Sequence, residues 1–257
     1  MILLLVLLIF LVLVLWKTFP RAHTHVEEYT DKGADGKGAM VIVEPRAHLM
    51  LPMVIREFDR VVPKDFTLYV VHGTSNATYA RTAASNIVRP TVFIRLETDD
   101  LTADQYNALL TDPEFWKLIK AEHVLVFQTD SVPCGRPLDI DKFGRFGYIG
   151  CAYGDKAGRD TYWGTNAFYG VGGLSLRRKS FMQRCLANER KGPEDVAFSN
   201  CVEEFPEYSK PTARDISDFC AQNSNNGSRS WGAHQAKHMP SGERDAFRRQ
   251  CPLSAFT

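Results

Sequence analysis

The stretch HVLVFQTDS, from His123 to Ser131, decides how the rest of this chain is interpreted. Its first part is strongly apolar, which is typical of a strand in a buried sheet. It ends abruptly in a short polar cluster that carries one carboxylate, Asp130. Ligands of open α/β sheets bind at the carboxyl ends of the strands. The stretch therefore predicts that Asp130 lies where a metal-bound phosphate could reach it.

The residues before this stretch predict an alternation of strands and helices. The expected strands cover 40–44, 66–72, 91–96 and 124–128. The expected helices cover 48–61 and 75–85, and helical stretches are expected from 102 to 119. Such an alternation indicates βαβ crossovers and a mostly parallel sheet with helices on both faces. After Ser131 the pattern weakens. There we expect a helical turn at 138–143, strands at 146–152 and 168–176, a helix at 194–205 and a loop at 223–230.

Length and charge limit the classes of protein that fit. The chain has 257 residues, which suits a single domain of ordinary size with a full hydrophobic core. It carries 31 basic and 30 acidic residues, so its formal net charge is +1. No overall field therefore favours nucleic acid or an anionic membrane surface. Any phosphate binding must come from a local arrangement of residues.

An uninterrupted apolar run opens the chain, from Met1 to Trp16, and Lys17 and Arg21 close it. A helix that spans a bilayer needs about 20 apolar residues, whereas the core of a signal peptide has roughly 7 to 15. The run falls between these lengths, no small-residue cleavage site is obvious after it, and Trp16 suits a membrane interface. We therefore expect an uncleaved transmembrane or signal-anchor segment at 1–17, a flexible stem at 18–39 and the folded domain at 40–257.

The sequence leaves the side of the membrane open. Basic residues after the apolar run favour keeping that side in the cytosol. Sequons at 76–78 and 226–228 are instead compatible with a lumenal domain of the ER or Golgi type, which we expect for this single-pass protein. Six cysteines without a C-x-x-C pair argue against a zinc ribbon or a redox motif. They permit disulfides in a lumenal compartment, with buried free thiols as the alternative.

Seven segments in a consistent order, between residues 41 and 238, carry a family resemblance. They are VIVEPR (41–46), HGTSN (72–76), VLVFQTDS (124–131), FGYIGCAY (146–153), GVGGLSLRR (170–178), GPEDVAFS (192–199) and WGAHQAKH (231–238). With these segments the chain resembles a glycosyltransferase-like family of unassigned specificity, originally a domain of unknown function, that is related to the GT-A glycosyltransferases. The resemblance implies a GT-A-like, Rossmann-like domain at 40–257, with a mixed, mostly parallel sheet flanked by helices.

The same resemblance implies an activity. It is that of a hexosyl- or pentosyltransferase, which moves a sugar from a nucleotide-sugar donor to a glycan or protein acceptor with inversion. The resemblance also implies dependence on Mn²⁺ or Mg²⁺, because the leaving diphosphate develops negative charge that a divalent ion neutralises.

GT-A enzymes usually hold this ion with a D-x-D motif, since carboxylate oxygens are hard ligands for a hard cation. The matching triplet is Gln128-Thr129-Asp130, which lacks the first carboxylate and keeps the last, commonly the direct ligand. The alternative is that Asp130 only forms a turn at the strand end. A literal D-x-D occurs at Asp139-Ile140-Asp141, but no strand precedes it. We interpret it as acids at a helix start.

Two further segments are expected at the same site. The glycine turn at 170–173 would pass beneath the donor sugar or the acceptor, so Gly172 and Gly173 are donor-site candidates, although a β-bulge explains the glycines equally well. Glu194 and Asp195 are the candidates for the base that takes the proton of the acceptor hydroxyl. We rank Asp195 first and Glu194 second. The alternative is that both acids only complement the dipole of the helix that they open.

His234 is the second expected metal ligand, because a late histidine in GT-A enzymes often completes the metal shell or meets the diphosphate. An exposed surface histidine is the alternative. His234 and His238 would share one helix face if this segment were helical, but no H-E-x-x-H motif accompanies them. The remaining donor-site candidates lie at the ends of the expected strands or near His234, and they are Glu44, Arg46, His72, Asn76, Gln128, Thr129 and Lys237.

The leading hypothesis is a membrane-anchored, metal-dependent glycosyltransferase. One alternative is a metal-dependent nucleotidyltransferase or phosphohydrolase, which would share Asp130 but would need a second clustered carboxylate. Another is a non-catalytic carbohydrate-binding protein on the same fold. The sequence does not determine the sugar, the nucleotide base or the acceptor.

Overall fold

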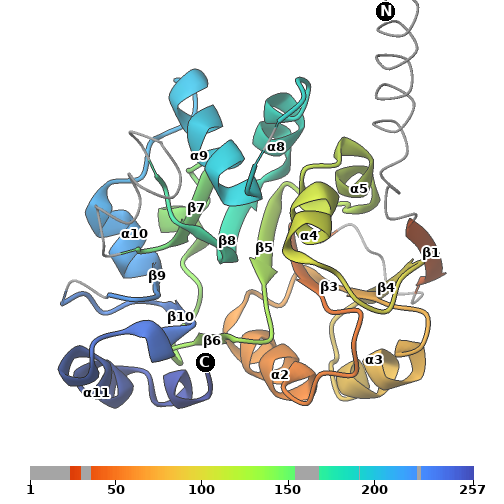
Figure 1. Cartoon of the computed structure of the whole chain (residues 1–257), viewed down its shortest axis with the longest axis horizontal. Helices are drawn as coiled ribbons and strands as arrows, with labels where there is room; N and C mark the ends of the chain where they lie inside the picture. The colour runs from red at the N-terminus through yellow and green to blue at the C-terminus, as the bar shows by residue number, and fades with distance from the viewer. Residues whose placement is uncertain (1–23, 30–35, 154–167, 191, 225–226) are drawn as a thin grey trace, which may run out of the picture.

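A computed structural model describes residues 24–29, 36–153, 168–190, 192–224 and 227–257 of the chain, and its architecture is mixed α/β (Figure 1). The predicted anchor at 1–17 and the second sequon's Asn226 lie outside these residues. In the described part, no helix combines the length and the apolar character needed to cross a bilayer.

The centre of the molecule is a seven-stranded sheet. In spatial order its strands are β1 (Thr24–Tyr29), β4 (Thr91–Leu96), β3 (Phe66–His72), β2 (Gly38–Val43), β5 (His123–Phe127), β8 (Val171–Arg178) and β7 (Tyr148–Cys151). The neighbouring pairs from β4 to β5 are parallel, whereas β1 and β8 run antiparallel to their neighbours. The predicted mixed, mostly parallel sheet is therefore confirmed.

The order of the strands reverses at β2. The chain leaves β2 on one side, to form β3 and then β4, and later returns to place β5 on the other side of β2. A crevice forms outside the carboxyl ends of the strands at such a reversal, and ligands of α/β proteins bind there. The fold thus locates one crevice between the end of β2 and the end of β5.

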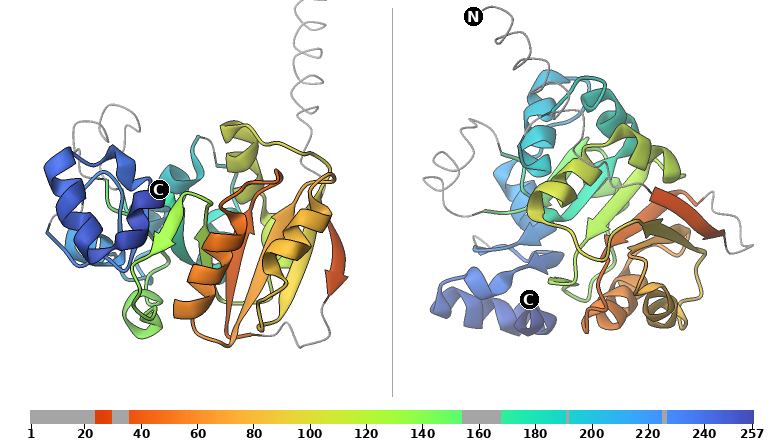
Figure 2. Two further views of the ribbon diagram at one scale, coloured as in Figure 1. Left: turned by 90° about the horizontal axis from the view of Figure 1, so that it is seen from below. Right: turned by 45° about the vertical axis from the view of Figure 1, so that its right-hand side comes forward.

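Helices cover both faces of this sheet, as Figures 1 and 2 show. Helices α2 (Leu51–Val61) and α3 (Ala77–Ala84) lie on one face. The other face carries α4 (Ala103–Leu110), α5 (Pro113–Leu118), α8 (Lys179–Cys185) and α9 (Glu194–Glu204). Because both faces are covered, the central strands are apolar along almost their whole length rather than at every second residue.

A smaller unit follows in the carboxyl-terminal half. Its three-stranded sheet has the order β6 (Ser131–Pro133), β10 (Gly232–His234) and β9 (Cys220–Ala221). Around it lie α6 (Ile140–Phe143), α10 (Ala213–Phe219), α11 (Ser241–Gln250) and the 3₁₀ turns η1 (Ala236–His238) and η2 (Pro252–Phe256). Its own small core includes Val132, Ala233 and Phe247.

An aromatic cluster joins this smaller unit to the central sheet. Phe58 of α2 lies 4.4 Å from Phe127 at the end of β5 and 5.9 Å from Trp231, between ring centroids. Trp231, which immediately precedes β10, stacks on Phe219 of α10 at 5.6 Å. Its indole N–H also donates to the carbonyl of Arg136. The two units therefore share one packed aromatic contact.

All six cysteines form disulfides, and all lie in the carboxyl-terminal half. The pairs are Cys134–Cys251, Cys151–Cys220 and Cys185–Cys201. The first ties the segment after β6 to the end of α11, the second ties β7 to β9, and the third ties α8 to α9. Of the two alternatives that the sequence left open, the structure contains disulfides and not free thiols.

Two expectations about the elements, at 24–39 and at 168–176, need correction. Residues 24–29, within the predicted stem, form the edge strand β1, and β2 already begins at Gly38. The helical stretches expected between 102 and 119 are confirmed as two helices, because Asp112 caps a new helix that begins at Pro113. The strand expected at 168–176 is shifted and runs from Val171 to Arg178.

Candidate functional site

A cavity of about 500 Å³ lies at the strand reversal, outside the carboxyl ends of β2 and β5. Its volume is in the range of small-molecule and cofactor sites. All predicted site residues except His72 and Asn76 line it. The lining residues are Val43, Glu44, Pro45, Arg46, His48, Asp100, Leu101, Thr102, Ala103, Tyr106, Asn107, Gln128, Thr129, Asp130, Val171, Gly172, Gly173, Glu194, Asp195, His234 and Lys237.

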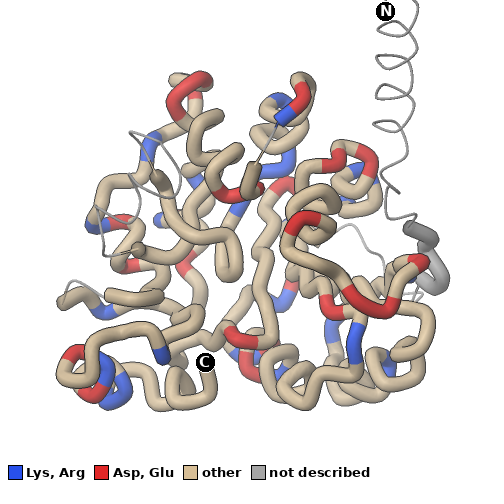
Figure 3. Tube along the Cα trace, viewed as in Figure 1, with Lys and Arg blue, Asp and Glu red and all other residues tan. Residues whose placement is uncertain are grey.

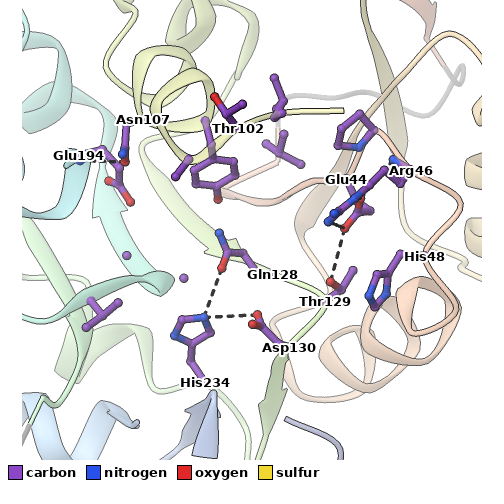
Figure 4. Close-up of a pocket in the computed structure, with 18 of the residues that line it drawn as sticks. Glu44, Arg46, His48, Thr102, Asn107, Gln128, Thr129, Asp130, Glu194 and His234 are labelled. Atoms are coloured by element: carbon purple, nitrogen blue, oxygen red, sulfur yellow. Dashed lines mark hydrogen bonds and ion pairs between the residues drawn. The ribbon is translucent and has the colours of Figure 1, made fainter. Parts of the chain in front are cut away.

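One wall is built where β2 ends. The carboxylate of Glu44, only 3% exposed, accepts hydrogen bonds from Arg46 through Nε at 2.8 Å and through the backbone N–H at 3.1 Å. The hydroxyl of Thr129, which follows β5, lies 3.4 Å from the same carboxylate (Figure 4). Glu44 and Thr129 therefore join the two strand ends across the reversal point. The Arg46 side chain remains exposed at the rim.

His72 and Asn76, which the sequence predicts in the donor site, do not line this cavity. Asn76 is 3% exposed, and its side-chain amide donates to the carbonyls of Glu44 and Arg46 while its oxygen accepts the N–H of Gly73. These bonds hold the loop after β2 in place. The His72 side chain is fully buried, and its Nδ1 contacts the carbonyl of Gly73. Burial of Asn76 also makes it unsuitable as a glycosylation acceptor in the folded domain.

A second wall brings together the expected metal ligands. The Nε2 atom of His234 lies 3.3 Å from Oδ1 of Asp130 and 3.2 Å from Oε1 of Gln128 (Figure 4). The other ring nitrogen, Nδ1, lies 2.9 Å from Oε1 of Gln222, which fixes the orientation of the ring. His234 is 3% exposed and ends strand β10, so it is neither a surface histidine nor part of a helix with the exposed His238.

Asp130 is more than a turn residue at a strand end. Gln235 holds it twice, through Nε2 to Oδ2 at 2.9 Å and through its backbone N–H to the Asp130 carbonyl. Gln235 takes up a left-handed conformation, with φ of 49°, to make these contacts. Burial alone would raise the pKa of Asp130, but the hydrogen bonds and charge of His234 and the bond from Gln235 outweigh it and lower the pKa to about 2. Asp130 is therefore ionised at all physiological pH values.

Three donor atoms of suitable chemistry thus converge at this wall. They are one carboxylate oxygen, one imidazole nitrogen and one amide oxygen, from Asp130, His234 and Gln128. This set suits a divalent ion such as Mn²⁺ that takes its other ligands from phosphate and water. Gln222 lies where a partner that orients a metal-binding histidine is usually found. The described residues contain no group of three or more His, Cys, Asp or Glu side chains with the spacing of a metal site.

The glycines of β8 leave room for these side chains. A Cβ atom on Gly173 would lie 2.3 Å from Nε2 of His234, and one on Gly172 would lie 1.9 Å from Oε1 of Glu194. Both separations are far below van der Waals contact. The pairing of β7 with β8 is also irregular between Ile149 and Cys151, so a bulge accompanies the glycines. Glycine is required here because side chains from two other segments occupy the space.

The third wall is the start of α9, where two adjacent acids have different surroundings. Glu194 is 3% exposed and forms a two-pronged ion pair with the fully buried Arg177, at 2.8 and 3.0 Å. Burial raises the pKa of Glu194 to about 7; Arg177 opposes this rise and the neighbouring Asp195 adds to it. Its backbone N–H donates to Oδ1 of Asn107 on α4. Glu194 is thus fixed by contacts within the protein.

Asp195 is only half-buried, and among the residues that the structure describes no cationic side chain is bonded to it. Its carboxylate accepts the N–H of Gly172 at 3.3 Å and the N–H of Val196 at 2.9 Å. Burial raises the pKa of Asp195, against the opposing effect of these hydrogen bonds and of the charge on Arg177. A carboxylate of this kind is oriented by the backbone and is a stronger base than an ordinary aspartate.

Several lining residues were not predicted from the sequence. Tyr106 and Asn107 lie on α4, and Thr102 caps that helix with its side chain. His48 lies in the loop after β2, where its Nδ1 accepts the N–H of Met50. Their position in the sequence could have identified two of them as site residues, because His48 and Thr102 both follow strands whose carboxyl ends face the crevice. The literal Asp139-Ile140-Asp141 motif lies elsewhere, and Asp139 caps α6 by accepting the N–H of Lys142, as expected for acids at a helix start.

The charge of the cavity differs from that of the whole molecule. Figure 3 shows basic and acidic residues interspersed along the chain, in line with the formal net charge of +1. The cavity lining instead contains more acidic than basic side chains, namely Glu44, Asp100, Asp130, Glu194 and Asp195 against Arg46 and Lys237. Two of these acids are paired, Glu44 with Arg46 and Glu194 with Arg177. Among the described lining residues, acidic side chains therefore outnumber basic ones, which is unfavourable for a diphosphate without a cation.

Comparison with known proteins gives a family match without an activity. A family model described as "Protein of unknown function (DUF5672)" matches residues 93–235, which include the triplet at 128–130, Glu194, Asp195 and His234. No curated protein matches the sequence. The structure is similar to the crystal structure of S. aureus TarS 1-349, with a TM-score of 0.45 and 16% sequence identity over 65% of this chain. The match spans 55% of that chain.

Proposed function

This chain belongs to the family described as a protein of unknown function (DUF5672), and we propose that it is a glycosyltransferase that uses a nucleotide-sugar donor and a glycan or protein acceptor. One observation carries the proposal. An ionised carboxylate beside a histidine, Asp130 with His234, and a backbone-held base candidate, Asp195, line the same crevice at the strand reversal. Transfer of a sugar from a diphosphate needs both kinds of group at one site.

The proposed reaction is a single displacement with inversion. The acceptor hydroxyl gives its proton to Asp195 as its oxygen bonds to the anomeric carbon of the donor. The bond between that carbon and the phosphate oxygen breaks at the same time, and the nucleoside diphosphate leaves with the electron pair. The raised pKa of Asp195 supports its role, because a stronger base takes the proton more readily.

We propose that the leaving group needs a divalent ion, Mn²⁺ or Mg²⁺. The excess of acidic over basic side chains in the lining supports this, because an anionic donor would otherwise meet an unfavourable field. Asp130, His234 and Gln128 would hold the ion. When bound, it would neutralise the charge that develops on the diphosphate. Lys237, exposed at the cavity rim, would contact a phosphate from the other side.

The nucleoside would occupy the part of the crevice next to β2. Glu44, Arg46 and His48 follow that strand, and Asp100 and Thr102 follow β4. Their side chains and the backbone between them offer both donors and acceptors to a base and a ribose. Asn76 supports this role indirectly, because it fixes the loop that carries Glu44 and Arg46.

We also propose that the domain works in an oxidising compartment such as the ER or Golgi lumen, attached through its amino-terminal apolar run. The three disulfides support this, since structural disulfides persist in oxidising compartments and are rare in the cytosol. Protease protection of the domain in intact microsomes, together with a mobility shift on reduction, tests the proposal. A domain that is digested without detergent would contradict it.

A non-catalytic carbohydrate-binding protein is the second candidate, because Gln128 stands where GT-A enzymes usually have a carboxylate. The test is a screen of nucleotide sugars by thermal shift, followed by assays of donor hydrolysis and transfer with and without Mn²⁺. We expect one donor to raise the melting temperature only when the metal is present, and to be turned over. Asp130→Ala should lose both effects. Glycan binding without turnover of any donor would favour the second candidate.

The same assays test the alternative that the protein is a nucleotidyltransferase or phosphohydrolase. Such an enzyme would cleave a nucleotide sugar between its two phosphates, so the products would be a nucleoside monophosphate, free or joined to an acceptor, and a sugar phosphate. A glycosyltransferase releases the nucleoside diphosphate instead. The identity of the nucleotide product therefore separates the two classes of enzyme.

A further inference from the structure

Arg177 is a buried charge that the proposed reaction does not use. It lies on β8, has no exposed surface and does not line the cavity. Its guanidinium packs against three aromatic rings, with centroids 5.1 to 5.8 Å away, which belong to Trp116, Tyr148 and Phe198. Burying an arginine is costly unless its donors are paired. The hydrogen-bond and ion-pair partners of Arg177 therefore indicate its role.

These partners surround Gly172, a residue of the cavity wall. Arg177 donates through Nε to the hydroxyl of Ser175 at 2.9 Å, and that hydroxyl donates to the carbonyl of Gly172 at 2.9 Å. Arg177 also lies 3.4 Å from the same carbonyl through a terminal nitrogen. The N–H of Gly172, on the other side of the residue, donates to Asp195. A chain of contacts thus runs from Arg177 through Gly172 to the carboxylate at the cavity.

The counter-ion of Arg177 lies beside that carboxylate. Glu194 precedes Asp195 in the chain and takes two contacts from the guanidinium. Because burial raises the pKa of Glu194 to about 7, this acid is largely protonated in mildly acidic solution and leaves the charge of Arg177 uncompensated there. That positive charge favours the ionised form of Asp195.

We propose that Arg177 is a positioning residue for Asp195: it holds Gly172, whose N–H orients the carboxylate, and its charge keeps that carboxylate ionised. This inference rests on the proposed function for the role of Asp195 as the base. Arg177 itself touches neither the donor nor the acceptor.

The other charged or titratable groups around Asp195 do not supply the same effect. Glu194 lies on the same helix, Tyr148 of β7 interacts electrostatically with Asp195, and Tyr106 of α4 lines the same cavity. Burial raises the pKa of both tyrosines, so they stay neutral over the pH range of an assay. Among the described groups that act on Asp195, Arg177 is the cation.

The test compares Arg177→Met with Arg177→Lys, which keeps the charge but not the two-pronged geometry. The readout is the ¹³C shift of the Asp195 carboxyl against pH, assigned by its loss in Asp195→Asn. In Arg177→Met the titration should move to higher pH, and in Arg177→Lys it should stay near that of the parent. With an active donor, kcat of Arg177→Met at pH 6 should fall about tenfold more than at pH 8, while KM for the donor stays unchanged.

A matched control lies next to it on the same strand. Arg178 is partly exposed and pairs with Glu122, away from the cavity, so Arg178→Met should leave the titration of Asp195 unmoved. If Arg177→Met fails to fold, the double variant Arg177→Met with Glu194→Leu replaces it, because exchanging both members of a buried pair for apolar residues is often tolerated. It should show the same upward movement.

One outcome would contradict the inference about Arg177, and a different outcome would contradict the proposed function on which it rests. An Asp195 titration that is unchanged in a folded Arg177→Met or double variant overturns the positioning role, whatever the activity. Absence of turnover with every nucleotide sugar removes the proposed function, but the carboxyl titration still decides whether Arg177 controls Asp195.

Discussion

The amino-terminal and carboxyl-terminal halves of this molecule differ in how they are stabilised and in what they give to the cavity. The first half, up to β5, contains long buried parallel strands and has no cysteine. The second half has strands of two or three residues in its smaller sheet and all three disulfides. The regular half provides the crevice, and the irregular half provides His234, Glu194 and Asp195. The proposed metal ligand His234 and the proposed base Asp195 therefore come from the half that carries the disulfides.

The largest expected effect is on turnover and belongs to the second half. Asp195→Asn should lower kcat by roughly 10² to 10⁴-fold, as loss of a general base usually does, while donor binding stays near that of the parent. Transfer assays and donor titrations measure the two quantities. Asp141→Asn is the matched control, because Asp141 is an exposed acid in the first turn of α6. Equal turnover in parent and Asp195→Asn would remove Asp195 from the mechanism.

Removal of cross-links should destabilise the second half in an order set by loop length. Replacing Cys134 and Cys251 by serine opens a loop with a separation of 117 residues, and replacing Cys185 and Cys201 opens one of 16. The chain-entropy model predicts a loss of about 5 kcal/mol for the first and about 3 kcal/mol for the second. Denaturant unfolding of the two double variants measures both losses. The reverse order would mean that strain or residual structure, not loop entropy, dominates.

The pH dependence of stability should show the effect of Glu194. Its pKa is about 7 in the folded protein against an ordinary value of 4.5, so the folded state binds the proton more tightly than the unfolded state. Stability should therefore fall as pH rises from about 4.5 to about 7, by on the order of 3 kcal/mol from this group. Glu194→Gln should lack that part of the fall. Parallel stability curves for parent and variant would contradict the raised pKa.

The smallest effect is expected in the first half, at Asn76. Asn76→Ala removes the hydrogen bonds to the carbonyls of Glu44 and Arg46, which should cost about 1 to 3 kcal/mol of stability. Donor affinity should weaken only modestly, because the loop loosens but no ligand contact is lost. Ser85→Ala is the control, since its hydroxyl makes one exposed bond within a helix end. A large loss of donor affinity at unchanged stability would indicate that Asn76 contacts the donor directly.

The sequence predicted the first half well for a physical reason. The bounds expected for the strands at 66–72 and 91–96 agree with β3 and β4. Strands that are buried on both faces have nearly continuous apolar sequences, so their ends are easy to locate. Polar residues after such runs mark the crevice, so Glu44, Arg46 and Asp130 could be assigned to one site. The break at Pro113 was also readable, since Asp112 before a proline is a helix start.

The second half could not be read in the same way. Strands of two or three residues are too short to show a period, and the polar stretch THVEEY at 24–29 gave no strand signal either. Disulfide connectivity does not follow from cysteine spacing. Some side chains contact residues that are distant in the sequence, so no local motif identifies them. They are Arg177, Gln222 and Gln235.

The aromatic contact between Phe58, Trp231 and Phe219 has a mechanical consequence for ligand capture. Trp231 lies three residues before His234, and Phe58 packs on the residue that precedes Gln128. A motion that widened the crevice by moving the smaller unit away from the central sheet would have to separate these rings. The segments that carry His234 and Gln128 are therefore held together before a ligand binds, and little of the binding free energy is spent on bringing them together.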